Sequence, residues 1–302
     1  MKLRDALSRQ YRRLRATLNF YCNESRLPGF VPRGHFYSPL PDLSTTTARR
    51  ATGELAGDVF PGINLNSGSQ HETLLRIIEV YREFDWTLER KPDRRFYLNQ
   101  GYFKQADAIC MFALMRLFSP RRVIEVGSGF SSALMLDVND QFLNGETQLT
   151  FIDPYPERLN EVLRPDDFSK ARIITQAVQQ VPLSIFEELQ SNDILFIDSS
   201  HVSKTGSDVN YLYFEVFPRL GPGVVVHVHD IFWPFEYPRE FIQEGHAWNE
   251  AYLIRAFLSF NANFEIIFWT PYAGEKWRDL IVNRMPAYME NTGASLWLRR
   301  TH

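Results

Sequence analysis

Short runs of apolar residues, each followed by a helical pattern, fill the chain from residue 121 onward. Five runs predict strands, at 122–126, 149–152, 172–175, 193–197 and 223–228. Helical patterns separate them at 130–143, 156–163, 183–190 and 207–219. Near-continuous apolar strands that alternate with helices are typical of a parallel sheet covered on both faces. This part of the chain therefore predicts an α/β domain.

Two more strands are predicted near the end of the chain, after a helix over 248–259. They span 264–269 and 294–299, and no strong helical pattern lies between them. We therefore expect an antiparallel hairpin at one edge of the sheet.

The first hundred residues have a different texture. A basic amphipathic helix is predicted over 2–21, and residues 28–70 are rich in Pro, Gly, Ser, Thr and Asn. Two helices follow, at 71–84 and 102–118. We expect an accessory, helical and irregular segment over 1–100, ahead of the main domain at 101–302. The basic helix fits packing on its own protein or on a second subunit of a homo-oligomer; a membrane surface or an acidic partner is the alternative.

Composition narrows the class of protein. The chain has 302 residues, is 44% hydrophobic and carries a formal net charge of −3, which gives no case for a nucleic-acid partner. Its two cysteines match neither a disulfide framework nor a zinc cluster. No apolar run approaches the roughly 18 residues of a membrane span, and arginines interrupt the N-terminus where a signal peptide is apolar. We expect a cytoplasmic protein without integral membrane association.

A glycine loop joins the first strand to the helix that follows. Gly127 and Gly129 let the backbone turn sharply and approach a ligand closely, and Ser131 or Ser132 can cap the helix. A dinucleotide fingerprint would need a third glycine where this chain has Ser132. Glu125, just before the loop, is unnecessary for a pyrophosphate but suits a cationic ligand such as S-adenosylmethionine (SAM).

Two acids end the fourth and fifth strands. Asp198 follows the fourth strand, with His201 close behind it, and Asp230 follows the fifth. Ligands of open parallel sheets bind outside these carboxyl ends, and adjacent strands lie about 4.8 Å apart, so the two acids can converge. Two carboxylates that close are costly unless one is protonated or a cation lies between them, and Mg²⁺ would satisfy both.

On these residues, the chain from about 121 to 300 resembles the class I SAM-dependent methyltransferases, whose first motif is an acid followed by Gly-x-Gly. The resemblance implies a Rossmann-like sheet of order 3-2-1-4-5-7-6, with strand 7 antiparallel. It also implies that Glu125, Gly127, Ser128 and Gly129 line the methionine portion of SAM and that Asp153 bonds the ribose hydroxyls. Ser131 at the helix start and Tyr102 just ahead of the core are expected at the cofactor by their positions.

The strand-end residues resemble the metal-dependent O-methyltransferases that act on sugar hydroxyls of macrolides. Their fourth strand ends Ile/Val-Asp-Gly-Ser-His, which this chain matches over 197–201 with Ser199 in place of Gly. Their fifth strand ends in two acids, and His229 takes the place of the first. The resemblance makes Asp198 and Asp230 metal ligands, His229 a third ligand that favours Mn²⁺ or Fe²⁺ over Mg²⁺, and His201 the general base.

The sequence thus predicts a SAM-dependent methyltransferase that acts on a hydroxyl of a small glycosylated or phenolic metabolite. It leaves open whether a divalent ion assists or His201 acts alone. Alternatives on the same fold are metal-dependent hydrolysis or hydroxylation, and a catalytically silent subunit that binds a partner through the helix at 2–21. A nicotinamide dehydrogenase ranks lower because of Ser132 and the paired acids.

Overall fold

The structure is a computed structural model, and it describes residues 31, 34–41 and 60–302. The basic helix predicted over 2–21 and most of the irregular stretch at 28–70 lie outside these residues. By their contacts, Gly57–Glu236 and Trp248–His302 form one compact unit, which contains the sheet. A second unit includes Tyr237–Ala247, with the helix α10 (Arg239–Glu244).

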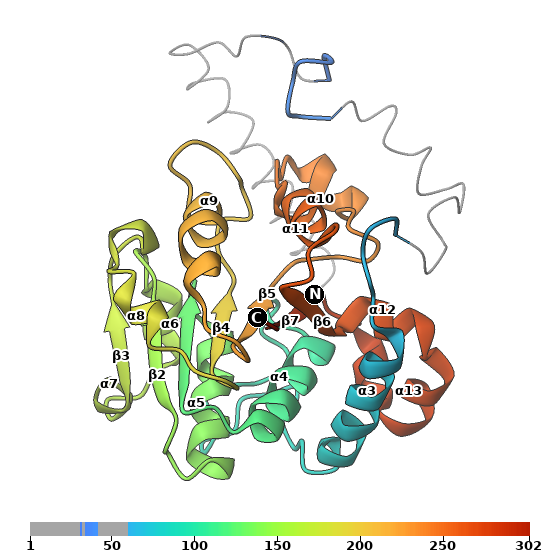
Figure 1. Cartoon of the computed structure of the whole chain (residues 1–302). Coiled ribbons are helices and arrows are strands. Elements are labelled where there is room, and N and C mark those ends of the chain that lie inside the picture. The colour runs from blue at the N-terminus through green and yellow to red at the C-terminus, as the bar shows by residue number, and fades with distance from the viewer. Residues whose placement is uncertain (1–30, 32–33, 42–59) are drawn as a thin grey trace, which may run out of the picture. The chain divides into compact units, whose positions relative to one another are not determined.

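Seven strands form a single sheet of order β3-β2-β1-β4-β5-β7-β6 (Figure 1). The neighbours among β1 to β5 are parallel, and β7 runs antiparallel to both β5 and β6. The strand bounds are β1 (Arg122–Val126), β2 (Gln148–Ile152), β3 (Ala171–Ile174), β4 (Ile194–Ile197), β5 (Val225–Val228), β6 (Phe264–Trp269) and β7 (Leu296–Arg300). This confirms the sheet order that the resemblance implied.

The central strands are apolar because both of their faces are covered. Every residue of β4 and β5 is buried, as are four of the five residues of β1. In register, Val126 pairs with Ile197 and Ile197 pairs with Val228. Parallel pairing in this register ends β1, β4 and β5 at the same edge, so the polar residues that follow each strand are brought together there.

Helices α3 (Ser67–Tyr81), α4 (Gln105–Phe118), α5 (Phe130–Phe142) and α6 (Glu157–Val162) pack against one another in chain order (Figure 1). The middle of this layer is α4, which is buried without a break over 106–115. The remaining helices of the compact unit are α7 (Asp167–Lys170), α8 (Ser184–Glu187), α9 (Asp208–Tyr211), α11 (Glu250–Leu258), α12 (Thr270–Lys276) and α13 (Arg278–Arg284). In the described part of the chain, no helix combines the length and the apolar character that crossing a membrane requires.

The helix predicted over 207–219 is irregular. It begins as α9, continues as a π-helical turn over Leu212–Val216 and ends in a 3₁₀ turn over Phe217–Arg219. Pro218 lies in this last turn, and because proline has no N–H to donate, the α-helical bonding pattern cannot continue through it.

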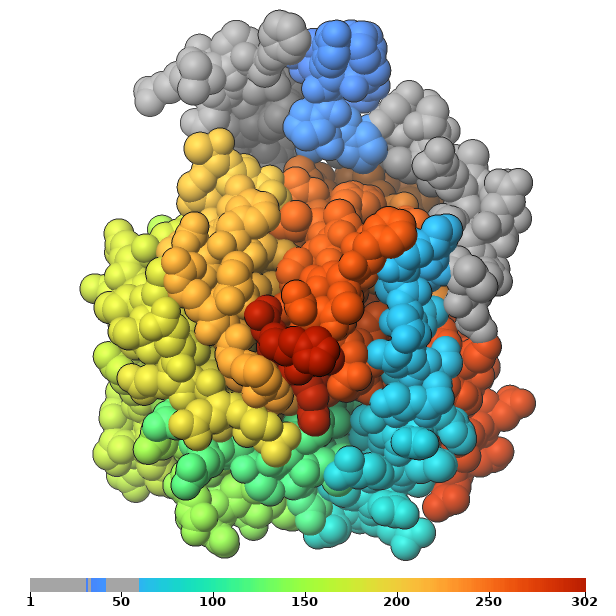
Figure 2. Space-filling view, in the orientation of Figure 1, coloured from blue at the N-terminus to red at the C-terminus, as the bar shows by residue number. Residues whose placement is uncertain are grey.

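The two late strands pair antiparallel, as expected, but they are not a simple hairpin. Between them lie α12, α13 and a 3₁₀ turn over Pro286–Glu290, so the expectation of a helix-free connection was wrong. Both helices have only seven residues, and Pro271 and Gly274 interrupt the apolar spacing of the first. The last residues of the chain follow β7 to the surface, where His302 is exposed (Figure 2).

A buried ion cluster ties the segment between α3 and α4 to the helix layer. The guanidinium of Arg95 lies 2.9 Å from Asp137 Oδ1, 2.8 Å from Asp140 Oδ2 and 2.5 Å from Asp167 Oδ1. Asp137 also accepts hydrogen bonds from the main-chain N–H of Arg95 and the indole N–H of Trp86. The side chains of Asp137 and Asp167 are fully buried, so their charges depend on this arginine.

Replacement of this arginine should be costly. In Arg95→Met, buried carboxylates lose their counterion, and we expect the free energy of unfolding to fall by about 3–5 kcal/mol. Arg122→Met is the control, since this arginine is 31% exposed and its nearest carboxylate oxygens lie 3.9 Å away; its loss should be within about 1 kcal/mol. Urea unfolding at neutral pH measures both, and equal losses would contradict the importance assigned to the cluster.

Candidate active site

The structure brings together three of the side chains predicted at the strand ends. His201 Nε2 lies 3.3 Å from Asp198 Oδ1 and 3.7 Å from Asp230 Oδ2. One possible ligand atom from each of the three residues lies within 4.8 Å of the others. The imidazole is almost completely buried, whereas the carboxylates of Asp198 and Asp230 are 33% and 21% exposed. The two acids can therefore meet a ligand from outside.

The backbone at this cluster adopts an uncommon conformation. His201 has φ +59° and Asp230 has φ +56°, in the left-handed region that residues other than glycine rarely occupy. The carbonyl of His201 accepts hydrogen bonds from the N–H groups of Asn249 and Glu250, at 3.0 and 3.2 Å, which hold the loop in place. Strained residues of this kind persist where the surroundings determine them, and they are concentrated at functional sites.

Glu250, the first residue of α11, completes the cluster. Its side chain is fully buried, and Oε2 lies 3.0 Å from His201 Nδ1. The other oxygen, Oε1, has no hydrogen-bond partner among the described residues. With Nδ1 directed at Glu250, the second nitrogen of His201 faces Asp198 and Asp230. The sequence contains no specific signal for this role, because an acid at a helix start is common for reasons of the helix dipole alone.

The charges of the cluster depend on one another. Burial lowers the pKa of His201, but hydrogen bonds to Asp198 and Glu250 and the charge of Asp230 outweigh it and raise this pKa well above its usual value. Burial raises the pKa of Asp198, and the positive charges of His229 and His201 lower it further than burial raises it. The pKa of Asp230 stays raised by burial. A protonated His201 thus balances the surrounding carboxylates.

The two histidines of the fifth strand have different environments. His229 is buried, with Nε2 3.9 Å from Asp230 Oδ1, and it does not belong to the three-residue group of close donor atoms. Burial lowers the pKa of His229, but Asp198 and Asp230 raise it more. His227 stacks on Phe196 at 3.7 Å and its Nε2 lies 2.9 Å from the hydroxyl of Ser295. Burial lowers the pKa of His227 well below its usual value, so it is a neutral core histidine.

The glycine loop packs directly on the end of β4. Gly127 has φ +83°, and a Cβ on this residue would overlap the main-chain carbonyl of Asp198. The N–H of Asp198 in turn donates to the carbonyl of Val126 at 2.8 Å. Glycine is therefore required at position 127 both for its dihedral angles and for the close approach. This contact couples the predicted cofactor loop to the acid cluster.

Glu125 lies inside the protein beneath this loop. Its fully buried carboxyl group accepts hydrogen bonds from the hydroxyls of Ser131, at 2.5 Å, and Ser132. Burial raises the pKa of Glu125 to about 8, although the two serine hydrogen bonds lower it, and the charges of Asp198 and Asp153 raise it again. Glu125 thus links the end of β1 to the start of α5.

The remaining predicted cofactor residues surround the same loop. Asp153 Oδ2 accepts hydrogen bonds from the N–H and hydroxyl of Ser128, at 2.9 and 3.1 Å. Tyr102 is 60% exposed and stacks on Phe130, the first residue of α5, with ring centroids 5.9 Å apart. A residue that the sequence did not single out joins them, since the guanidinium of Arg158 lies 4.1 Å from the centroid of the Tyr102 ring.

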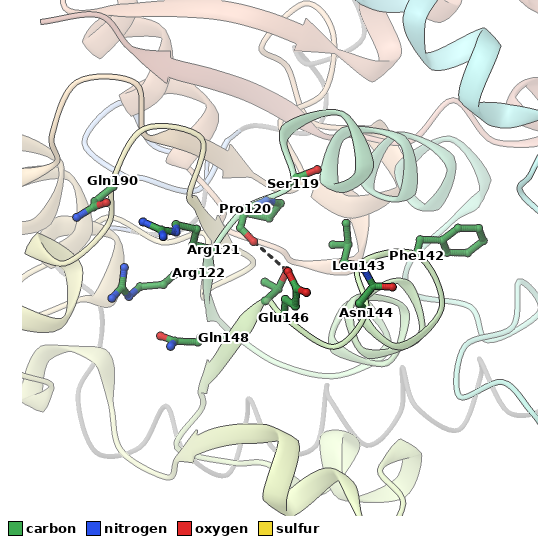
Figure 3. Close-up of a pocket in the computed structure, with 11 residues that line it drawn as sticks. Ser119, Pro120, Arg121, Arg122, Phe142, Leu143, Asn144, Glu146, Gln148 and Gln190 are labelled. Atoms are coloured by element: carbon green, nitrogen blue, oxygen red, sulfur yellow. Dashed lines mark hydrogen bonds between the residues drawn. The ribbon is translucent and has the colours of Figure 1, made fainter.

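A separate hollow of about 520 Å³ lies at the opposite edge of the sheet, at the amino ends of β1 and β2 (Figure 3). Arg121, Arg122 and Gln148 line it, and the Thr147 hydroxyl donates to the carbonyl of Pro120 at 2.8 Å in its wall. Asp198, His201 and Asp230 are not among the residues that line it, so the volume of this hollow does not make it the active site.

Comparison with known proteins indicates the family to which the chain belongs. The model of a family described as "Methyltransferase domain" matches residues 124–231, from within β1 to just beyond Asp230. An uncharacterized protein of Archaeoglobus fulgidus is 36% identical over 188 residues, which are 58% of this chain and 81% of that protein. With the sheet order and the glycine loop, the chain belongs to the class I SAM-dependent methyltransferases. It is an enzyme whose cofactor is SAM.

Solved methyltransferases resemble the chain more distantly. The O-methyltransferase TomG from Streptomyces achromogenes, in complex with SAM, is 14% identical with a TM-score of 0.43, over 76% of this chain and 90% of that one. The methyltransferase PaMTH1 of Podospora anserina, bound to SAH, is 12% identical with a TM-score of 0.44, over 82% and 100%. At this distance, neither carries an argument about acceptor or metal.

The close approach at Gly127 yields a matched comparison. In Gly127→Ala the new methyl group must displace the carbonyl of Asp198, so we expect loss of SAH binding and a clear loss of stability. Gly145→Ala has a similar φ of +71° but open space around the new methyl group, so only the dihedral cost of about 1–2 kcal/mol should appear. Calorimetry with SAH and urea unfolding test both variants; intact SAH binding by Gly127→Ala would contradict the coupling.

The raised pKa of Glu125 predicts a pH-dependent stability difference. Because the folded-state pKa of about 8 exceeds the ordinary 4.5, the folded protein binds more protons than the unfolded chain between these values. The contribution of Glu125 to the free energy of unfolding therefore falls as the pH rises from about 4.5 to 8. Glu125→Gln lacks this titration, so its stability relative to the wild type should increase over that window. Urea unfolding at pH 5, 6.5 and 8.5 measures it, and a constant difference would refute it.

Proposed function

We propose that this methyltransferase transfers the methyl group of SAM to a hydroxyl oxygen of a small glycosylated or phenolic metabolite, with a divalent ion held by Asp198, His201 and Asp230. The observation that carries the proposal is the convergence of three donor atoms within 4.8 Å, beside a glycine loop that packs on Asp198.

The residues present fit a divalent ion. Two carboxylates and one imidazole nitrogen form a donor set that suits Mn²⁺, Fe²⁺ or Co²⁺ better than Mg²⁺, which prefers oxygen ligands only. Histidines that bind metals usually donate their second N–H to a carboxylate, and Glu250 lies 3.0 Å from His201 Nδ1 in that position. The paired acids also need a positive charge, which the imidazolium supplies when no ion is bound.

This assignment changes the proposed role of His201. The resemblance made His201 the general base and His229 the third metal ligand. In the structure, Nε2 of His201 points at Asp198 and Asp230, and His229 is not in the group of donor atoms that lie within 4.8 Å of one another. A single free nitrogen cannot act as ligand and base at once. We therefore propose His201 as the ligand and retain the base role, with an ion on Asp198, Asp230 and His229 or without any ion, as the alternative to be tested.

The reaction assigns separate tasks to the two sides of the cluster. SAM supplies a methyl group by in-line displacement, in which the C–S bond breaks, the new O–C bond forms and sulfur leaves as a neutral thioether. A divalent ion would lower the pKa of a hydroxyl beside it, so that the hydroxyl proton can pass to solvent water as the new O–C bond forms. The glycine loop and Asp153 hold the cofactor, and the exposed faces of Asp198 and Asp230 orient the acceptor. No leaving-group acid is required.

The proposal predicts separable binding events. Calorimetry should show SAH binding by the wild type, and Mn²⁺ binding that Asp198→Asn abolishes while SAH binding persists. Asp279→Asn, an exposed acid on α13, is the control and should change neither. Turnover, followed as SAH release from SAM with a set of sugar and phenol acceptors, should fall at least 100-fold in Asp198→Asn. Absence of SAH binding with and without Mn²⁺ would overturn the proposed function.

Two further variants separate the roles of His201. If it is a ligand oriented by Glu250, His201→Ala should abolish Mn²⁺ binding and Glu250→Gln should weaken it about 10- to 100-fold, without an effect on SAH binding. If it is only a base, both variants should bind Mn²⁺ like the wild type while His201→Ala loses turnover. Unchanged turnover in His201→Ala would refute both roles.

A further inference from the structure

Arg158 lies across the glycine loop. It belongs to α6, five residues after Asp153, and its side chain packs so closely on Gly129 that a Cβ on the glycine would lie 2.8 Å from Arg158 Cδ. Its guanidinium carbon lies 4.1 Å from the centroid of the Tyr102 ring, which is itself stacked on Phe130. These contacts hold both the aliphatic part and the guanidinium of Arg158 in position, although the residue is exposed.

The charge of Arg158 is not neutralised by a carboxylate of the described part of the chain. Within the described residues, no carboxylate lies at ion-pair distance from its guanidinium, whereas other arginines around α5 and α6 are paired or hydrogen-bonded. Asp153 lies at the same loop, and the charge of Arg158 contributes to lowering the pKa of Asp198. A cation that is held beside the glycine loop, with no carboxylate of the described residues at ion-pair distance, is suited to a ligand that carries its own negative group.

The chemistry of SAM supplies such a group. Its sulfonium and α-ammonium groups are positive and are compatible with the acids, but its α-carboxylate requires a cationic donor. We propose that Arg158 binds the α-carboxylate of the methionine portion of SAM, with Tyr102 holding the guanidinium plane. The inference rests on the SAM site of the proposed function.

The geometry suits this role. Gly129 belongs to the loop expected to line the methionine portion of SAM, so Arg158, which packs on this glycine, lies beside that portion. A guanidinium presents a planar fork that can bond both carboxylate oxygens, and stacking on an aromatic face reduces the freedom it loses on binding. Lysine would keep the charge and lose the fork.

The test compares two cofactors that differ by one group. Calorimetry measures SAM and decarboxylated SAM, which retains the sulfonium and the amine but lacks the carboxylate. Arg158→Ala should weaken SAM about 10- to 100-fold and leave decarboxylated SAM unchanged, and Arg158→Lys should lie between. The control is Arg172→Ala, an exposed arginine of β3, which should bind both cofactors like the wild type.

Each other result has its own meaning. Equal weakening of both cofactors by Arg158→Ala would overturn the proposal and reduce Arg158 to a support of the loop. Tighter SAM binding would overturn it as well and make the arginine a barrier over Gly129. If the wild type bound decarboxylated SAM as tightly as SAM, no residue would read the carboxylate. If it bound neither, the proposed function itself would fail, which distinguishes that failure from a fault in the role of Arg158.

Discussion

The site depends on the balance of negative charge at one edge of the sheet. The carboxyl ends of β1, β2, β4 and β5 bring Glu125, Asp153, Asp198 and Asp230 into a confined region, and Glu250 adds a fifth carboxyl group from α11. Like charges this close cannot all remain ionised without compensation. The structure responds in three ways. Burial raises the pKa of Glu125, so that its carboxyl group can stay protonated, and a cationic His201 lies between carboxylates. Bound ligands are left to supply any further positive charge.

Backbone geometry makes this balance possible. The left-handed conformations of His201 and Asp230 turn two loops back over the strand ends, and hydrogen bonds from the start of α11 hold the first of them. The glycine loop adds a second constraint, since only a residue without a side chain can pack on the carbonyl of Asp198. A change in the cofactor loop is therefore transmitted mechanically to a proposed metal ligand, and the two halves of the site cannot vary independently.

The segment before the first strand supports the site from the side. Arg95 anchors it through buried carboxylates on α5 and α7, and the same segment then delivers Tyr102 to the glycine loop. Asp107, on α4, is similarly buried and bonds the Ser295 hydroxyl at 2.6 Å, just ahead of β7. A buried polar group without its hydrogen-bond partners lowers the stability of the fold. These groups therefore favour the one packing of α4 and its neighbours against the sheet in which every partner is present.

Local pattern was sufficient for the seven strands, the parallel core and the glycine loop, because buried strands must be apolar and a tight strand-to-helix turn needs glycine. It also predicted that Asp198 and Asp230 converge, since residues that follow parallel strands share one edge, and the structure places both beside His201, while the catalytic roles of these residues stay predictions. It failed at α12 and α13, where proline and glycine obscure short helices. The contacts of Glu250, of Arg158 and of the Arg95 cluster became apparent only in the tertiary structure. Each acts on partners distant in sequence, and an acid at a helix start or an arginine on a short helix looks ordinary until folding places its partner beside it.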